Sequence, residues 1–234
     1  MAALAVIVFI VLGIFASQRA AALETAEEER RRADGLLEAI LPSSIAKRLK
    51  GGETRIAEQH EATVLFADVV GFTTLAARLA ADELVELLDG LFRDFDELVE
   101  RHDGVIKIKT IGDSYMVAVG APLMRHDHAQ VAAGFALQLV DVAARAQVPG
   151  ASNESRGPSL GRQRPVFDLW GDTVNIASRL ESQGVPGRIQ ISEITHDLLG
   201  GDYECEARGF VDVRGRGRMR TWFLVGPREA GTDA

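Results

Sequence analysis

Residues 64–73 read VLFADVVGFT, a segment that joins an apolar run to a carboxylate and then to a helix start. The run from Val64 to Phe66 is typical of a short buried strand. Asp68 is therefore expected at the carboxyl end of that strand, where α/β sheets usually place ligands. Residues 71–73 open a predicted helix, whose N-terminus would offer free N–H groups and partial positive charge to a phosphate beside the carboxylate.

A second segment, residues 106–117, reads IKIKTIGDSYMV and predicts a β-hairpin. Its isoleucines alternate with Lys107 and Lys109, as in a half-buried strand, and Gly112 with Asp113 forms the turn. The hairpin therefore carries a second carboxylate at its tip.

Each of the two carboxylates also has an ordinary explanation. Asp68 could simply cap the following helix, and Asp113 could simply be a turn residue, because short motifs match by chance at a high rate. Taken together, acidic side chains at such positions suit divalent metal ions, and these ions commonly accompany triphosphates.

A third segment, residues 167–182, reads FDLWGDTVNIASRLES. Its first four residues are strand-like, Gly171 provides a turn, and Asp172 or the threonine after it could cap the helix that follows. Asn175 and Arg179 are four residues apart, so they share one face of that helix. An amide beside a guanidinium suits a sugar and a phosphate, although a solvated polar helix face explains the pair equally well in isolation.

These three segments resemble, in their order, blocks of the class III nucleotidyl cyclases, the family of adenylyl and guanylyl cyclases. Two later segments extend the resemblance, VPGRIQIS at 185–192 and VRGRGRMRTWFLV at 213–225, so that it runs from about Thr63 to Val225. The resemblance implies an α+β, ferredoxin-like catalytic domain that works as a homodimer, because the two walls of the family's active site lie on different subunits.

The resemblance also assigns one wall of this active site. Asp68 and Asp113 would hold two divalent metal ions, Mg²⁺ or Mn²⁺, and the backbone carbonyl of Val69 would be a further ligand. Phe72 and Thr73, at the helix start, would contact the substrate.

The other wall follows from the same resemblance. Lys109 and Asp168 would read the purine, Asn175 would orient the ribose, and Arg179 would stabilise charge on the reacting phosphate. Arg214 matches a basic position that contacts the departing phosphates.

The two base-reading residues favour ATP over GTP. Lys109 can donate a hydrogen bond to adenine N1, and Asp168 can accept one from the 6-amino group, whereas guanine presents the opposite pattern. The expected reaction is attack of the ribose 3′-oxygen on the α-phosphorus, which gives 3′,5′-cyclic AMP and pyrophosphate. The alternatives are a guanylyl cyclase and a catalytically silent module that only dimerises or binds nucleotide.

The composition agrees with one α/β domain and an appendage. The chain has 234 residues, of which 47% are hydrophobic and 26% charged. Its net charge of −8 argues against nucleic acid as a partner. Cys205 is the single cysteine, so there is no disulfide framework, as is typical of a reducing compartment.

Residues 1–17 contain no charged side chain and predict a transmembrane helix that is slightly short for a bilayer. The first arginines follow it, which places the catalytic domain in the cytoplasm and the protein at the cell membrane. A cleaved or buried apolar segment is the alternative, and the helix could also be the last of a longer membrane domain. Residues 18–52 predict a helical stalk with a weak a/d seam for parallel dimerisation, although a solvated spacer is possible. The catalytic domain then spans 53–228, and residues 229–234 form a disordered tail.

One region departs from the family. Before FDLWG the family usually has a strand and a Gly-rich hairpin, but residues 149–165 here read as a Gly/Ser/Pro loop. The missing strand would lie beside the one that leads to Asp68 and would leave its edge unpaired. Stability, dimerisation or activity is therefore expected to suffer.

Overall fold

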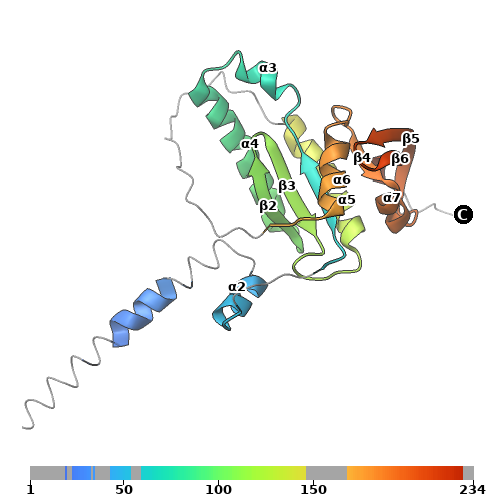
Figure 1. The fold of residues 1–234 in the computed structure, drawn as a ribbon. Coiled ribbons are helices and arrows are strands. Elements are labelled where there is room, and N and C mark those ends of the chain that lie inside the picture. Colours follow the sequence, from blue (N-terminus) through green and yellow to red (C-terminus); the bar gives the residue numbers. More distant parts are fainter. Residues whose placement is uncertain are drawn as a thin grey trace, which may run out of the picture. The chain divides into compact units, whose positions relative to one another are not determined.

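The computed structural model describes most of the chain in two units (Figure 1). One unit is Met1–Ile56 with Gln163–Phe167, and the other is Ala57–Arg162 with Asp168–Ala234. The described residues are 19, 23–32, 34, 43–53, 59–145 and 168–228.

The N-terminal unit is helical where it is described. Residues 23–32 form a helix, and α2 spans Ser43–Lys50; both lie within residues 18–52, where the sequence predicts a helical stalk. None of the described helices combines the length and apolar character needed to cross a bilayer. Residues 1–17, where the sequence predicts a transmembrane helix, lie outside the described residues, as do 229–234.

The first sheet of the larger unit is an antiparallel sheet in the order β1-β3-β2. Two long helices, α4 and α5, pack on one of its faces, where Phe95, Tyr115 and Phe135 are at most 3% exposed. The elements of this part are β1 (Thr63–Ala67), α3 (Phe72–Ala76), α4 (Ala81–Arg101), β2 (Val105–Ile111), β3 (Ser114–Val119) and α5 (His128–Arg145).

The second sheet is antiparallel in the order β4-β6-β5. Trp222 and Leu224 of β6 pack with Leu199 and with Ala129 and Ala133 of α5, so α5 contributes to both cores. The elements of this part are α6 (Asp172–Glu181), β4 (Ile189–Ser192), α7 (Glu193–Leu199), β5 (Tyr203–Val213) and β6 (Gly217–Pro227).

The structure confirms the predicted hairpin and changes one detail of it. β2 and β3 are joined at Gly112, whose φ of 64° suits glycine, and Asp113. The alternation of the sequence would place Lys107 and Lys109 on one face of the sheet. The structure instead has an irregularity in the register between them.

Two predictions for residues 167–182 are wrong in detail. Residues 168–170 are irregular rather than a strand, and Phe167 lies outside the described residues. The N-cap of α6 is Gly171, without a side-chain cap hydrogen bond. Asp172 does not cap the helix; its carboxylate forms an ion pair with Arg216.

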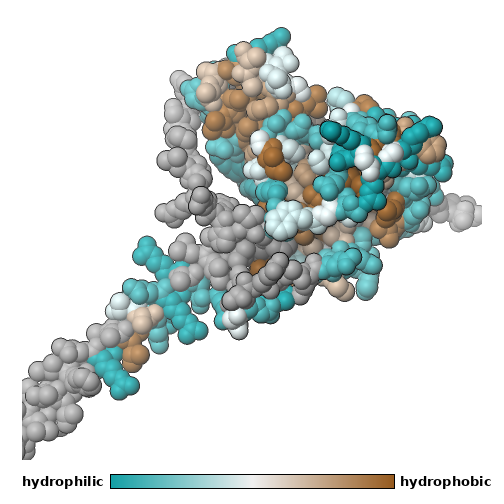
Figure 2. Space-filling model, in the orientation of Figure 1, coloured by the Kyte–Doolittle hydropathy of each residue, from teal (hydrophilic) through white to brown (hydrophobic). Residues whose placement is uncertain are grey.

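The structure tests only part of the expectation that the strand leading to Asp68 has an unpaired edge. Within the described part of the chain, β1 pairs with β3 alone, and residues 146–167 lie outside that part. α6 packs against β1. In the view of Figure 2, apolar side chains gather over α3 and the adjoining end of α4. Val70, just before α3, and Val85, in α4, are exposed.

Candidate functional site

The two predicted metal-binding carboxylates meet at one end of the first sheet. Asp68 follows the end of β1, and Asp113 lies in the turn between β2 and β3. Burial, and then the negative charge of Asp113 and the interaction between the two carboxyl groups, raise the pKa of Asp68 above its usual value. The site thus concentrates negative charge that is stabilised only when a proton or a cation is present.

A third carboxylate, Glu181, joins this pair and was not predicted from the sequence. It is the last residue of α6, and its carboxyl group interacts with that of Asp68. Burial, and then the charges of Asp68 and Asp113, raise the pKa of Glu181. A glutamate at a helix C-terminus opposes the helix dipole, and this unfavourable position is the one sequence signal that could have identified it. Asp68, Asp113 and Glu181 are called the acidic group below.

The residues that follow Asp68 form the predicted helix start. The carbonyl oxygen of Val69 accepts a hydrogen bond from the Phe72 N–H at 3.1 Å, and a carbonyl has a second lone pair for a cation. Phe72 is half-buried and Thr73 is exposed, at the start of the five-residue helix α3. Gly71 precedes them with a φ of 74°.

The acidic group is compatible with divalent cations. Mg²⁺ usually takes one or two carboxylates and fills its other positions with water and substrate phosphates. Asp68, Asp113 and the Val69 carbonyl provide such a set of hard oxygen donors. Among the described residues no group of three or more His, Cys, Asp or Glu side chains is arranged to hold a metal ion. The donor set suits a cation that takes its remaining ligands from water or phosphate oxygens.

The predicted base-reading residues are in direct contact. Lys109 Nζ lies 2.5 Å from Asp168 Oδ2. The Asp168 side chain is only 9% exposed, and its other oxygen accepts a hydrogen bond from the Leu169 N–H at 2.9 Å. A donor and an acceptor with fixed positions are thus presented side by side, which is what the edge of a purine requires.

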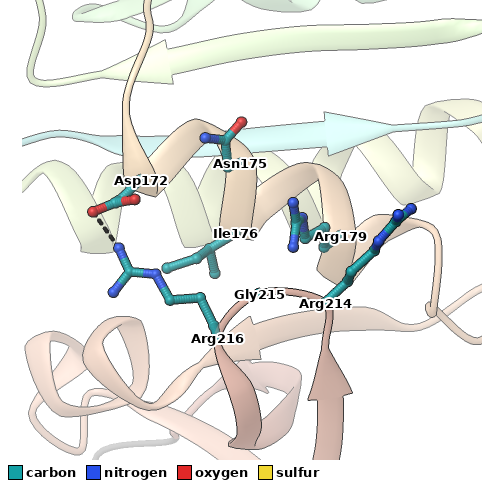
Figure 3. Close-up of a pocket in the computed structure, with 7 residues that line it drawn as sticks. All are labelled: Asp172, Asn175, Ile176, Arg179, Arg214, Gly215 and Arg216. Atoms are coloured by element: carbon teal, nitrogen blue, oxygen red, sulfur yellow. Dashed lines mark ion pairs between the residues drawn. The ribbon is translucent and has the colours of Figure 1, made fainter.

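The remaining predicted residues line a pocket of about 120 Å³ between α6 and the β5–β6 turn (Figure 3). α6 contributes Asn175 and Arg179 to its lining, and the turn contributes Arg214. Across the pocket Arg216 forms an ion pair with Asp172, and the Arg216 guanidinium lowers the pKa of that carboxyl. The lining, called the arginine pocket below, consists of Asp172, Asn175, Ile176, Arg179, Arg214, Gly215 and Arg216.

The chemistry of the arginine pocket favours an anion. The lining contains three guanidinium groups and one carboxylate, which is paired with Arg216, so two positive charges are left within the pocket residues. Guanidinium groups bind phosphate oxygens through paired N–H donors. Arg216 is a second residue that the sequence analysis did not single out, although it lies two positions after Arg214 in the same Arg-Gly repeat.

The comparison with known proteins decides the family. Residues 55–226 match the family model of the adenylate and guanylate cyclase catalytic domain. The chain belongs to this cyclase family. The predicted α+β cyclase catalytic domain is therefore confirmed.

Individual relatives give the same result. The chain is 45% identical over 216 residues to an adenylate cyclase of Mycobacterium tuberculosis, a match that covers 87% of this chain and 48% of the relative. The chain thus spans about half the length of this curated relative.

Solved cyclase domains share the fold. The catalytic core of a rhodopsin-guanylyl cyclase with converted specificity, in complex with ATPalphaS, has a TM-score of 0.64 and 33% identity over 74% of this chain and all of that one. The non-canonical dimeric guanylyl cyclase domain of the RhoGC fusion protein from Blastocladiella emersonii has a TM-score of 0.63 and 29% identity over the same shares.

Proposed function

We propose that the chain is an adenylate cyclase that converts ATP to 3′,5′-cyclic AMP and pyrophosphate as a metal-dependent homodimer. The observation that carries the choice of ATP is the Lys109–Asp168 pair, a cation and a buried carboxylate 2.5 Å apart. Lys109 would donate to adenine N1 and Asp168 would accept from the 6-amino group, while guanine has an N–H and a carbonyl in the opposite places. The 45% identity to the mycobacterial adenylate cyclase supports the same substrate.

The proposed catalysis rests on positioning and charge. Divalent cations bound at Asp68 and Asp113 would lower the pKa of the 3′-hydroxyl and neutralise the triphosphate. Asn175 would hold the ribose so that its 3′-oxygen lies in line with the α-phosphorus. Arg179 would stabilise the charge that develops as the 3′-O–P bond forms and the bond to pyrophosphate breaks, a contribution of about 10³–10⁵ in rate for comparable arginines. Arg214 would hold the leaving pyrophosphate.

The proposed homodimer would assemble the acidic group of one chain with the arginine pocket of the other. The dimeric cyclase domain among the similar structures supports an association of two copies. A site within one chain is the competing arrangement, since α6 carries Arg179 and also places Glu181 beside Asp68 of its own chain. Mixing of inactive chains, described at the end of the Discussion, separates the two.

The proposed organisation extends to the rest of the chain. Residues 1–17 would anchor the protein in the cell membrane, 18–52 would form the dimer stalk, 53–228 the cytoplasmic catalytic domain and 229–234 a tail. The uncharged stretch over residues 1–17 and the arginines that follow support this orientation. Recovery of the full chain in the membrane fraction, and its release when residues 1–17 are deleted, would test it.

A product assay tests the proposed function. The purified full chain is incubated with ATP or GTP, with Mn²⁺, with Mg²⁺ or with a chelator, and both cyclic nucleotides are quantified. We expect cyclic AMP from ATP only when a divalent metal is present. Predominant cyclic GMP would identify a guanylyl cyclase instead. Nucleotide binding without either product would identify a silent module.

A further inference from the structure

β2 contains one extra residue between its two lysines. Lys107 lies opposite Val117 of β3, and Lys109 lies opposite Met116, so two steps along β2 match one step along β3. Directly opposite residues of antiparallel strands share a face of the sheet, whereas Val117 and Met116, as neighbours on β3, lie on opposite faces. The bulge at Ile108 therefore turns Lys107 and Lys109 to opposite faces.

Lys107 is held on the face that α4 and α5 cover. Its Nζ lies 2.6 and 2.7 Å from the two carboxylate oxygens of Asp96 on α4. The hydroxyl of Tyr115 donates to the same carboxylate at 2.5 Å, and Lys107 Nζ lies 4.9 Å from the centre of the Tyr115 ring. Tyr115 is completely buried, and burial together with Asp96 raises its pKa, so it remains a hydrogen-bond donor. These three side chains, Asp96, Lys107 and Tyr115, are called the β2 clamp.

Lys109 depends on the bulge for its own contact. In a regular strand that kept Lys107 opposite Val117, Lys109 would lie opposite Tyr115 on the helix-covered face. It would then lie on the same face as Lys107, and its contact with Asp168 would be lost. With the bulge, Lys109 lies on the other face, where it reaches Asp168 at 2.5 Å.

We propose that Lys107 is a positioning residue for substrate recognition: the β2 clamp holds the bulge at Ile108 in place and thereby presents Lys109, beside Asp168, to the purine. The physical reason is that the bulge takes Ile108 out of the regular ladder pairing, which leaves β2 without that pairing just before Lys109. The charge-assisted bonds of Lys107 to both oxygens of Asp96 anchor the strand directly beside this break. The inference rests on the proposed role of Lys109 in reading the base.

The test compares Lys107→Met with Lys107→Arg in the full chain, by steady-state kinetics with ATP and with GTP. Arginine keeps the charge and the paired donors toward Asp96, whereas methionine keeps only the apolar stem. We expect Lys107→Met to raise KM for ATP by roughly 3- to 10-fold, with a smaller change in kcat and a lower preference for ATP over GTP. In Lys107→Arg, the KM for ATP and the preference for ATP over GTP should stay close to their wild-type values.

A double mutant separates positioning from general loss of stability. In a Lys109→Met background, Lys107→Met should have no further effect on the ATP/GTP preference, because the residue through which it acts is gone. Arg188→Met is the matched control, since Arg188 is similarly exposed and forms a single 2.5 Å ion pair with Glu206 on the other sheet. It should leave the preference unchanged. Equal effects of Lys107→Met in both backgrounds would overturn the proposal.

Hydrogen exchange gives a readout that needs no nucleotide. Amide protons of residues 107–110 should exchange faster in Lys107→Met than in wild type or Lys107→Arg, while those of β5 and β6 stay as they are. If Lys109→Met leaves nucleotide preference unchanged, the proposed base reading fails, and exchange still decides whether the clamp holds the bulge. Unchanged exchange around Ile108 in Lys107→Met would contradict the proposal.

Discussion

The acidic group and the arginine pocket differ in the sign of their uncompensated charge. The acidic group has an excess of carboxylates, and the arginine pocket has an excess of guanidinium groups. In the acidic group, Asp68 and Glu181 have raised pKa values because burial and neighbouring carboxylates disfavour their charged forms. The lining of the arginine pocket contains three guanidinium groups and only one carboxylate. The first region therefore favours cations and the second favours anions, and a metal-bound triphosphate provides both. α6 lines the pocket and ends beside Asp68, so a single helix positions the two regions.

Removing a carboxylate from the acidic group should have the largest effect. We expect Asp68→Ala and Asp113→Ala each to abolish cyclic AMP formation, because the proposed metal ions would hold the triphosphate there. The fold should persist, since each change removes repulsion. Product assay and thermal unfolding check the two statements, and undiminished activity in either variant would contradict the two-metal assignment.

Exchanging the base-reading pair should have an intermediate effect. Lys109→Glu combined with Asp168→Cys presents the polarity that suits guanine, and each mismatched buried group costs about 1–3 kcal/mol against the wrong purine. We therefore expect ATP use to fall and the preference to move toward GTP. Competition between the two nucleotides in one reaction measures the preference. If the preference for ATP is untouched, Lys109 and Asp168 do not read the base.

Glu181→Gln should have a small effect that depends on pH. Because the pKa of Glu181 is raised in the folded chain, the folded state keeps a proton that the unfolded state releases. The contribution of Glu181 to stability is therefore most favourable below its ordinary pKa, near 4.5, and decreases as the pH rises through the raised value. Without metal, we expect Glu181→Gln to raise Tm slightly at pH 7 and to flatten the fall in Tm between pH 4 and 7. Glu100→Gln, at an exposed glutamate of α4, is the control and should not flatten it.

Local sequence patterns predicted much of the fold and part of the two charged regions. The apolar run before Asp68, the turn at Gly112 and Asp113, and the four-residue spacing of Asn175 and Arg179 are all properties of neighbouring residues, and the structure contains each of them. Assignment of their roles required the resemblance to a family.

Features that depend on distant parts of the chain were not predicted. Glu181 joins Asp68 because α6 packs along β1, which no local pattern reports. The bulge at Ile108 depends on pairing with β3 and on Asp96 of α4, so the alternation of lysine and isoleucine gave the wrong face for one lysine. The strand-like start of residues 167–182 was wrong because β-propensity depends on a partner strand, and residues 168–170 have none among the described residues.

The most direct test of the account is complementation between the two regions. A chain with Asp68→Ala has a damaged acidic group and an intact arginine pocket, and a chain with Arg179→Ala has the reverse. Each should be inactive alone. If the two regions come from different chains, each mixed dimer regains one intact site, and an equal mixture should reach about a quarter of the wild-type rate. No recovery at any mixing ratio, in samples where mixed dimers are shown to form, would contradict a shared site and would place the acidic group and the arginine pocket of one chain in a single active site.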